Sequence, residues 1–399
     1  MTSPDEDTSD DTGDDTGAIR LLQLTAFVST FDRFAMPPML VAISRDLDVP
    51  LSQILTVAGT YFLVYGLMQP VWGMVSEQLG RVRTMQLTLI LAGAATMSSA
   101  FTSTSTALGV TRGMAGAFFG AAYPASLIYI GDTVPMARRQ PEVTRLMVGV
   151  ALGTAAASVG AGVLAERYSW RAAFVVTGGA ALLLAPALRR LPEPLRRAGG
   201  RRNPLAPLLE VLRTPTARLV LVLAFLEGAV LLGVLTLLPA AVHATGSSES
   251  VSGAVTAAYG VAVFAWAGLV GRLSRHLPAS RLIALGAAAA LASCVVLTVS
   301  RGPAVAVVVT VLMGFAWTFM HSSLQTWATE VVPHARAAVM SLFAASLFIG
   351  SAVAAAATGS LAEAGDYDRI FLLAALVAVP LGVVATAARA RWSPHADPV

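Results

Sequence analysis

Along most of the chain, long apolar stretches alternate with short polar ones, and the apolar stretches set the expected architecture. Twelve of them are roughly 18 to 25 residues long, the length of a helix that crosses about 30 Å of hydrocarbon. Their expected bounds are 19–43, 51–74, 84–101, 106–131, 143–165, 170–189, 217–241, 251–272, 281–299, 303–329, 337–361 and 369–390. The pattern predicts an all-α membrane protein with twelve transmembrane helices.

Composition supports the membrane prediction and excludes several classes of protein. The chain is 56% hydrophobic and 13% charged, whereas soluble domains carry about a quarter charged residues. A water-soluble enzyme or binding module could not bury this much apolar sequence. The net charge of +4 does not indicate a nucleic-acid partner, because the cations are arginines that concentrate in particular loops.

The arginines also predict the orientation of the chain. If both termini and the even-numbered connections lie on one side, that side collects 20 of the 27 arginines and the opposite side collects five. The remaining two, Arg33 and Arg112, fall inside predicted helices. Cytoplasmic loops of membrane proteins carry the excess of cations. We therefore expect a multi-pass protein of a bacterial cell membrane, the inner membrane where there are two, with both termini in the cytoplasm.

One long polar connection divides the chain. Residues 191–216 contain five prolines and several paired arginines, a composition typical of a linker. This predicts a cytoplasmic linker between an N-terminal bundle, 18–190, and a C-terminal bundle, 217–391. Residues 1–17 are acidic and of low complexity, so we expect a disordered cytoplasmic tail there, and residues 392–399 are expected to form a second short tail.

The two halves repeat one another. The segment Asp132–Arg138 recurs 198 residues later as Glu330–Arg336, and Gly162–Glu166 recurs 197 residues later as Gly359–Glu363. A nearly constant offset across separate motifs indicates an internal duplication. The sequence therefore predicts two pseudo-symmetric six-helix bundles.

A polar stretch between the second and third predicted helices, Gly73-Met-Val-Ser-Glu-Gln-Leu-Gly-Arg-Val-Arg83, resembles the corresponding loop of the major facilitator superfamily of secondary transporters. That family carries G-x-x-x-D-R-x-G-R-K/R-x, and here Glu77 and Gln78 replace Asp and Arg. The resemblance implies a gate on the cytoplasmic side of the bundle. Its expected members are Gly73, Glu77, Gly80, Arg81, Asp132 and Arg138.

The resemblance also assigns contacts to this gate. Arg81 is expected to meet Asp132, and Glu77 is expected to face the start of the segment 337–361, where the helix dipole favours a negative charge. Such a contact would hold the two halves together when the cavity faces outward. The second half has Arg275 at the position of Glu77, so we expect the gate to be asymmetric.

Ionisable side chains inside the predicted spans are few, and such residues are functional candidates because hydrocarbon disfavours charge. They are Asp32 and Arg33 in the first segment, Arg112 in the fourth, Glu227 in the seventh and His321 in the tenth. By resemblance, these four helices line the central cavity. We expect Asp32, Glu227 and Arg112 to couple transport to protons. The alternative is that Asp32 and Arg112 form a purely structural ion pair.

Other side chains on the cavity helices and their neighbours could contact a ligand, since aromatic rings suit amphipathic molecules. The alternative for most of them is ordinary helix packing. The expected substrate-binding residues are Arg33, Phe34, Tyr61, Tyr65, Phe119, Tyr123, Trp317, His321 and Gln325.

Three functions remain open. The small residues at 157–162 are similar to an export signature of drug:proton antiporters, although its proline is absent, and this favours proton-coupled export of drugs or secondary metabolites. The second is proton-coupled uptake of an organic anion through Arg33 and Arg112; related anion symporters carry an acid where this chain has Phe119. The third is a transporter-like sensor without flux.

Motifs for catalysis, ATP binding and metal binding are absent from the sequence, and its one cysteine, Cys294, predicts no disulfide. We therefore expect neither an enzyme nor a cofactor or metal site, and a gradient as the energy source. The expected partners are a small-molecule substrate, protons and the lipid bilayer, without nucleic acid. The protein is expected to act as a monomer.

Overall fold

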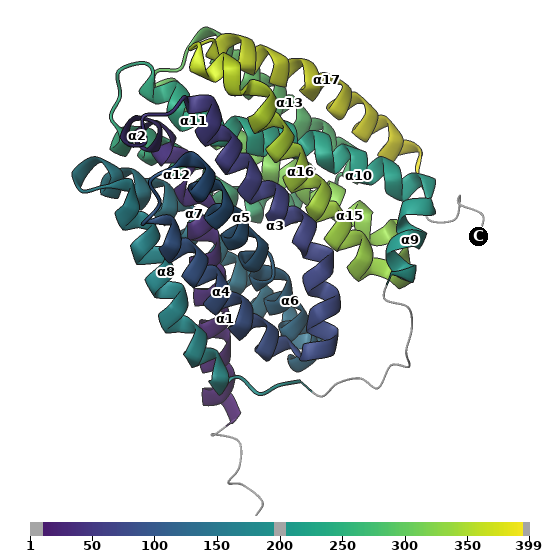
Figure 1. The fold of residues 1–399 in the computed structure, drawn as a ribbon. Coiled ribbons are helices and arrows are strands. Elements are labelled where there is room, and N and C mark those ends of the chain that lie inside the picture. The colour runs from purple at the N-terminus through teal and green to yellow at the C-terminus, as the bar shows by residue number, and fades with distance from the viewer. Residues whose placement is uncertain (1–10, 195–204, 394–399) are drawn as a thin grey trace, which may run out of the picture.

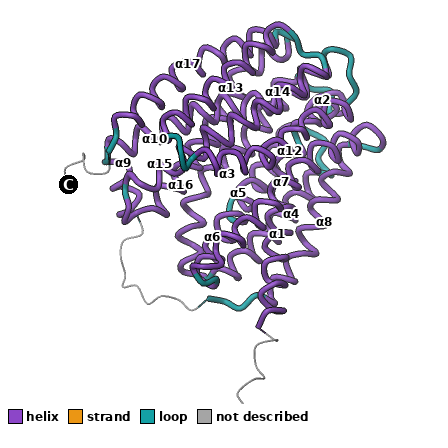
Figure 2. The backbone as a smooth tube through the Cα atoms, turned by 180° about the vertical axis from the view of Figure 1, so that it is seen from behind, coloured by secondary structure: helices purple, strands orange, loops and turns teal. Residues whose placement is uncertain are grey.

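The structure is a computed structural model that describes residues 11–194 and 205–393, and all regular elements within these ranges are helical (Figures 1 and 2). The first half contains α1 (Asp11–Ala35), η1 (Pro37–Met39), α2 (Leu40–Asp46), α3 (Leu51–Leu79), α4 (Arg81–Ser99), α5 (Ser105–Phe119), α6 (Ala122–Thr133), α7 (Met136–Arg167), α8 (Trp170–Ala187) and η2 (Leu188–Arg190). Here η marks a 3₁₀ or π turn.

The second half follows the same plan. It contains α9 (Ala206–Arg213), α10 (Pro215–Glu227), η3 (Gly228–Leu232), α11 (Gly233–His243), α12 (Glu249–Leu273), α13 (Ala279–Val299), α14 (Pro303–Ala316), η4 (Trp317–His321), α15 (Ser322–Val331), η5 (Pro333–Ala335), α16 (Arg336–Glu363) and α17 (Tyr367–Arg391).

The predicted membrane architecture is confirmed. Within the described ranges, eleven helical stretches are long and apolar enough to cross a membrane. The third predicted span is α4, which is 19 residues long and more polar, and it packs inside the first bundle against α5 and α8. Its position among the other helices, more than its own hydropathy, makes it part of the membrane core.

Four spans are interrupted, and the cause can be read from the sequence for the first. Proline has no backbone N–H and cannot continue the hydrogen-bond ladder, so the span that begins with α1 breaks at Pro37 and Pro38 and resumes as α2. The fourth span breaks between α5 and α6. The seventh and tenth spans contain π turns, η3 and η4, which are frequent at functional sites.

Some expected boundaries differ from the structure. The helix α1 begins at Asp11, so residues 11–17 of the expected disordered tail are helical, while residues 1–10 lie outside the described ranges. The linker contains a short helix, α9, because Pro207 near its first turn and the apolar spacing that follows favour one. Of the expected linker, residues 195–204 lie outside the described ranges, as do residues 394–399 of the expected second tail.

The two bundles meet at one end of the molecule and diverge at the other (Figure 1). We call the end that holds the connection between α8 and α10 the linker end, and the opposite end the loop end. The main contacts between bundles run between α3 and α16 and between α7 and α12. They are close: a Cβ added to Gly253 would lie 2.1 Å from the carbonyl oxygen of Ser158, and one added to Gly66 would lie 3.0 Å from that of Ala345.

At the linker end these helix pairs separate. A Cβ added to Gly73 of α3 or to Gly271 of α12 would meet no atom of a neighbouring described element within 4 Å. The bundles are therefore closed at the loop end and open at the linker end.

Candidate functional site

The first bundle is organised around a buried ion pair between α1 and α5. Arg112 binds Asp32 through both carboxylate oxygens, with Nη2–Oδ2 at 2.8 Å and Nη1–Oδ1 at 3.1 Å. Arg112 is 1% exposed and Asp32 is fully buried. Nη2 also donates to the carbonyl oxygen of Asp32 at 3.3 Å, four residues before the break in the helix. The pair anticipated between these residues is present.

The surroundings of this pair come from three more helices of the same bundle. Thr96 of α4 donates to Asp32 Oδ1 at 3.0 Å. The Arg112 guanidinium lies over the rings of Tyr61 on α3 and Phe174 on α8, at 4.7 and 4.6 Å from their centroids. Sequence reasoning missed Thr96 and Phe174, because a threonine or phenylalanine in a span carries no distinguishing signal before its neighbours are known.

Arg33, the next residue along α1, is placed differently. Its guanidinium donates to the hydroxyls of Tyr65 at 3.2 Å and Thr30 at 3.4 Å. Three rings surround it, those of Phe34, Tyr65 and Phe348, at 5.1 to 5.6 Å. Phe348 belongs to α16, so Arg33 lies between the two bundles. In the described part of the chain no carboxylate pairs with this cation.

The second bundle holds its own buried acid, Glu227, at the last residue of α10. Glu227 is fully buried, and its Oε2 lies 3.2 Å from Nδ1 of His321. Its other oxygen, Oε1, has no hydrogen-bond partner in the described structure. His321 stacks on Trp317 with ring centroids 3.9 Å apart. The sequence had singled out both residues without predicting that they meet.

Glu227 and His321 each lie at a π turn. The turn η3 begins directly after Glu227, and η4 begins at Trp317 and ends at His321. A π turn adds one residue per turn and rotates the side chains that follow it. Trp317 also contacts Tyr259 of α12, edge to face with centroids 6.5 Å apart. Arg33 and Glu227 are both close enough to Tyr259 to act on it electrostatically, so the two bundles' charged sites approach each other there.

The remaining expected substrate residues do not all reach the space between the bundles. Phe119 is fully buried in the core of the first bundle, so it packs helices in this state and its role in substrate binding stays a prediction. Tyr123 is partly exposed, and its hydroxyl lies 3.7 Å from the sulfur of Met147. Gln325 is half-buried on α15, one turn beyond His321. Tyr61 and Tyr65 are stacked and nearly buried, and they line the two arginine sites.

The closed loop end is held by two contacts that are counterparts under the internal repeat. Ser52, at the start of α3, donates to Glu363 Oε2 at the end of α16 at 2.5 Å. Ser250, at the start of α12, donates to Glu166 near the end of α7, with its backbone N–H at 2.9 Å and also with its hydroxyl. Both acids end the repeated motif Gly-x-Leu-Ala-Glu. The motif thus supplies the acid of two equivalent contacts between the bundles.

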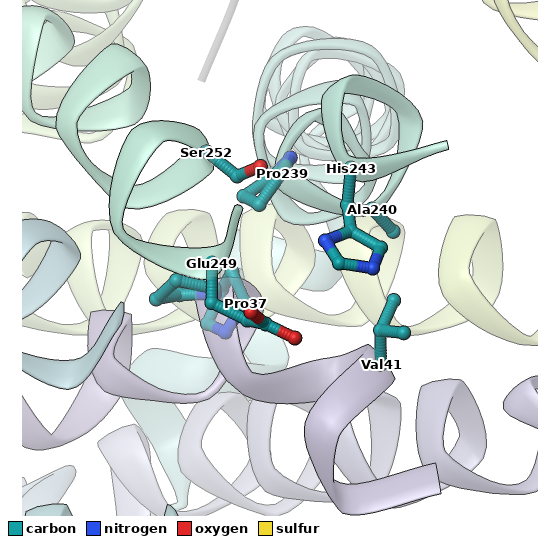
Figure 3. A pocket seen from close by; sticks show the side chains of 8 residues that line it. Pro37, Val41, Pro239, Ala240, His243, Glu249 and Ser252 are labelled. Atoms are coloured by element: carbon teal, nitrogen blue, oxygen red, sulfur yellow. The ribbon is translucent and has the colours of Figure 1, made fainter. Parts of the chain in front are cut away.

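A third contact at the loop end joins Arg45 to His243, which are counterparts of each other at the same offset of 198 residues. Arg45 of α2 reaches across to the second bundle, with Nη2 at 3.1 Å from His243 Nε2 and Nη1 at 3.8 Å from Glu249 Oε1. Figure 3 shows the small pocket beside it, where the helix break of the first span faces α11 and α12. The pocket is lined by Pro37, Pro38, Val41, Pro239, Ala240, His243, Glu249 and Ser252.

At the linker end, the expected contact between Arg81 and Asp132 is present, with Nε–Oδ2 at 3.3 Å. An unexpected residue, Glu193, accepts hydrogen bonds from the backbone N–H groups of Arg81, Val82 and Arg83 at the start of α4. Gly80 has φ of +104°, and a Cβ there would meet the Glu193 carboxylate at 2.8 Å. The positive φ favours glycine here, and a side chain would also displace the Glu193 carboxylate.

Glu77 is exposed and makes no hydrogen bond or ion pair with another residue of the described chain. Since the bundles are apart at this end, the predicted contact with the start of α16 could form only in another state. Its role stays a prediction. Gly73 lies near it on the exposed stretch of α3 that has left α16, and Arg138 lies in the first turn of α7.

Two helical bundles that pack closely at one end and separate at the other, each with a buried acid inside it, are the arrangement of a secondary membrane transporter. Residues 22–343 match the family described as the Major Facilitator Superfamily. The chain belongs to this superfamily of secondary transporters, whose members are not enzymes.

Solved structures agree on the fold. A bacterial homologue of the human lysosomal transporter Spinster, inward-facing and unoccupied, has a TM-score of 0.79 at 18% identity and covers 97% of this chain and 100% of its own. The nucleoside transporter NupG has a TM-score of 0.75 at 12% identity, over 94% and 100% of the two chains.

Two curated relatives align over shorter stretches. An MFS-type efflux pump of Mycolicibacterium smegmatis is 30% identical over 177 residues, which is 42% of this chain and 40% of that protein. The benzoate transport protein of Acinetobacter baylyi is 27% identical over 121 residues, 30% of this chain and 26% of that protein. The aligned part of this chain therefore spans less than half the length of either relative.

Proposed function

We propose that this protein exports small amphipathic molecules, drug-like compounds or secondary metabolites, in exchange for protons. It would work as a monomer in a bacterial cell membrane, with the linker end and both termini in the cytoplasm. The observation that carries the proposal is the Glu227–His321 pair, a fully buried carboxylate that faces a titratable partner and has one oxygen without a donor. The arginine excess at the linker end supports the orientation.

The reason lies in the balance of buried charge. An ionised carboxylate that is buried and only half satisfied is costly, and the acid form of Glu227 carries no charge. Its neighbour is the imidazole of His321, at 3.2 Å from Oε2, and not a permanently charged guanidinium. When Glu227 takes up a proton, no partner is left buried with a permanent charge. Glu227 can therefore bind and release a proton during the transport cycle.

Asp32 is less suited to this role in the present state, although the sequence had suggested it first. If Asp32 takes up a proton, Arg112 remains buried as a cation without a counter-charge, and breaking such a pair is strongly unfavourable. We therefore propose Glu227 and His321 as the residues that exchange protons. Asp32 and Arg112 would fix the relative positions of the helices around the cavity.

A second candidate function is proton-coupled uptake of an organic anion. The observation in its favour is Arg33, a cation between the bundles with only hydroxyl and ring partners, and the relative named as a benzoate transport protein points in the same direction. Arg112 would not take part, since Asp32 occupies it. The efflux-pump relative and the small residues of α7 favour export. A sensor without flux is the remaining alternative.

The test uses inside-out membrane vesicles that hold the protein and are acidified by respiration, with an acridine dye that reports the pH gradient. Compounds from a panel of amphipathic acids, bases and neutral molecules are added one at a time. An exported compound is expected to consume part of the gradient and to restore dye fluorescence. Glu227→Gln is expected to abolish this response for each compound, because glutamine cannot carry a proton.

The matched control is Asp368→Asn, which removes an exposed carboxylate at the start of α17 and is expected to leave the response unchanged. The melting temperatures of both variants are compared with that of the parent protein. A full response in Glu227→Gln would rule out this residue as the proton carrier, and no response to any compound in the parent protein would favour the sensor.

A further inference from the structure

The charge of the substrate can be inferred from Arg33, a cation between the two bundles that no carboxylate of the described chain pairs with. Within the described chain, the other buried arginine of this region, Arg112, has its own carboxylate. Arg33 has two neutral hydroxyl partners, and its Nε is buried without any partner. A guanidinium in this setting carries a full positive charge with weak compensation.

The rings around Arg33 compensate the charge only in part. Phe34, Tyr65 and Phe348 lie 5.1 to 5.6 Å from the guanidinium carbon, and cation–π contacts at such distances contribute about 0.5–2 kcal/mol each. They also form an apolar wall. Tyr65 and Phe348 are buried and in edge-to-face contact with centroids 4.6 Å apart, whereas Phe34 is partly exposed.

The position of this wall matters as much as its chemistry. Phe34 and Tyr65 belong to the first bundle and Phe348 to the second, close to where α3 and α16 pack at Gly66. A ligand held at Arg33 would therefore touch both bundles. Its binding would depend on their relative position, as is required of a transported substrate and not of a ligand bound within one bundle.

We propose that the substrate is an amphipathic monoanion, a carboxylate or sulfonate on a flat aromatic body, and that its anionic group binds Arg33. The planar guanidinium can donate two parallel hydrogen bonds to such a group, while the ring system packs on Phe34, the partly exposed ring of the three. One unpaired cation matches one negative charge, so a dianion or a cation fits less well. The proposal rests on the transport function proposed above and holds for either direction of transport.

The experiment compares three probes that share one ring system and differ in charge, 2-naphthoate, 2-naphthamide and 2-naphthamidine. Binding to the purified full-length protein in lipid nanodiscs is measured by calorimetry. The anion is expected to bind at least about tenfold more tightly than the neutral amide, the usual effect of hydrogen bonds to a charged group. Arg33→Gln is expected to remove this preference, and Arg33→Lys to restore part of it.

Arg145→Gln provides the matched control, because Arg145 is an exposed arginine of α7 that pairs with Glu142. It is expected to leave the affinities for all three probes unchanged. The proposal is overturned if the amide or the amidine binds as tightly as the anion, if the preference survives in Arg33→Gln, or if none of the probes binds at millimolar concentration.

The vesicle assay separates this inference from the proposed function. If neutral or cationic compounds consume the pH gradient in a Glu227-dependent manner while the anion preference is absent, proton-coupled export stands and the assigned substrate charge is wrong. If 2-naphthoate binds through Arg33 but no compound moves protons, the binding site stands and the transport function is wrong.

Discussion

At the scale of single residues, the partner of each buried acid decides what that acid can do. Asp32 and Glu227 are both fully buried and lie at similar places in the two halves. Asp32 faces an arginine, which stays charged at any physiological pH, whereas Glu227 faces a histidine and has one oxygen without a hydrogen-bond partner in the described structure. The first pair is suited to holding helices together and the second to exchanging protons.

This difference changes the expected effect of Asp32→Asn. From the sequence, the variant would stay folded and lose coupling. In the structure it leaves Arg112 buried without a counter-charge, so we expect a loss of about 3–5 kcal/mol of stability. The double variant Asp32→Asn with Arg112→Gln removes both charges and is expected to recover much of that loss. Thermal unfolding in detergent measures both effects.

A melting temperature of the single variant equal to that of the parent protein would contradict this expectation. The earlier view of Asp32 as a coupling residue would then regain support, provided that proton-driven transport is lost in the folded variant. The double variant guards against a different explanation, since a mere packing defect at Asp32 would not be relieved by a second substitution at Arg112.

At the scale of elements, the repeated motif at the ends of α7 and α16 acts as a pair of clamps on the opposite bundle. Each clamp joins the glutamate of one half to a serine at the start of a helix in the other half, Glu166 to Ser250 and Glu363 to Ser52. The close packing of α7 on α12 at Gly253 lies beside one of them. These contacts exist only while the loop end is closed.

We expect Ser52→Ala and Ser250→Ala each to shift the population towards the state that is open at the loop end, and the double variant to shift it further. A cysteine at Ser158, which is 1% exposed and faces Gly253, reports this opening through its rate of labelling by a maleimide. The native Cys294 is buried and gives little background. Unchanged labelling in the double variant would show that the clamps do not control the gate.

At the scale of the whole molecule, the two ends are gated by different means. The loop end closes through symmetric contacts, while the linker end carries charged residues that the repeat does not copy. Asp132 pairs with Arg81 of α4, whereas its counterpart Glu330 pairs with Arg389 of α17, with Oε2–Nη2 at 2.9 Å. Glu77 has Arg275 as its counterpart. The linker-end gate is therefore expected to be one-sided.

Glu77→Ala is accordingly expected to favour the state in which the linker end is open, because it removes a contact that we predict only for the opposite state. A cysteine at Gly271, which has open space around it in the present state, is expected to react faster in this variant. The cysteine at Ser158 is expected to react more slowly. Equal rates in variant and parent at both positions would remove Glu77 from the gate.

The sequence by itself determined the architecture. The length of the apolar stretches specifies membrane-spanning helices because hydrocarbon leaves no other way to satisfy the backbone, and the constant offset between motifs specifies two similar halves. It also identified the charged residues inside the spans as candidates for function, since charge in hydrocarbon is costly. The break at Pro37 and Pro38 followed from the chemistry of proline alone.

The tertiary structure decided which of those residues meet. That Asp32 pairs with Arg112 and not with Arg33, that Glu227 reaches His321, and that Glu193 covers the start of α4 depend on helix rotation and tilt. Such rotations arise from packing and from the π turns η3 and η4, which have no clear sequence pattern. The open end was also decided there, because alternative packings of the same two bundles use the same residues and differ little in free energy.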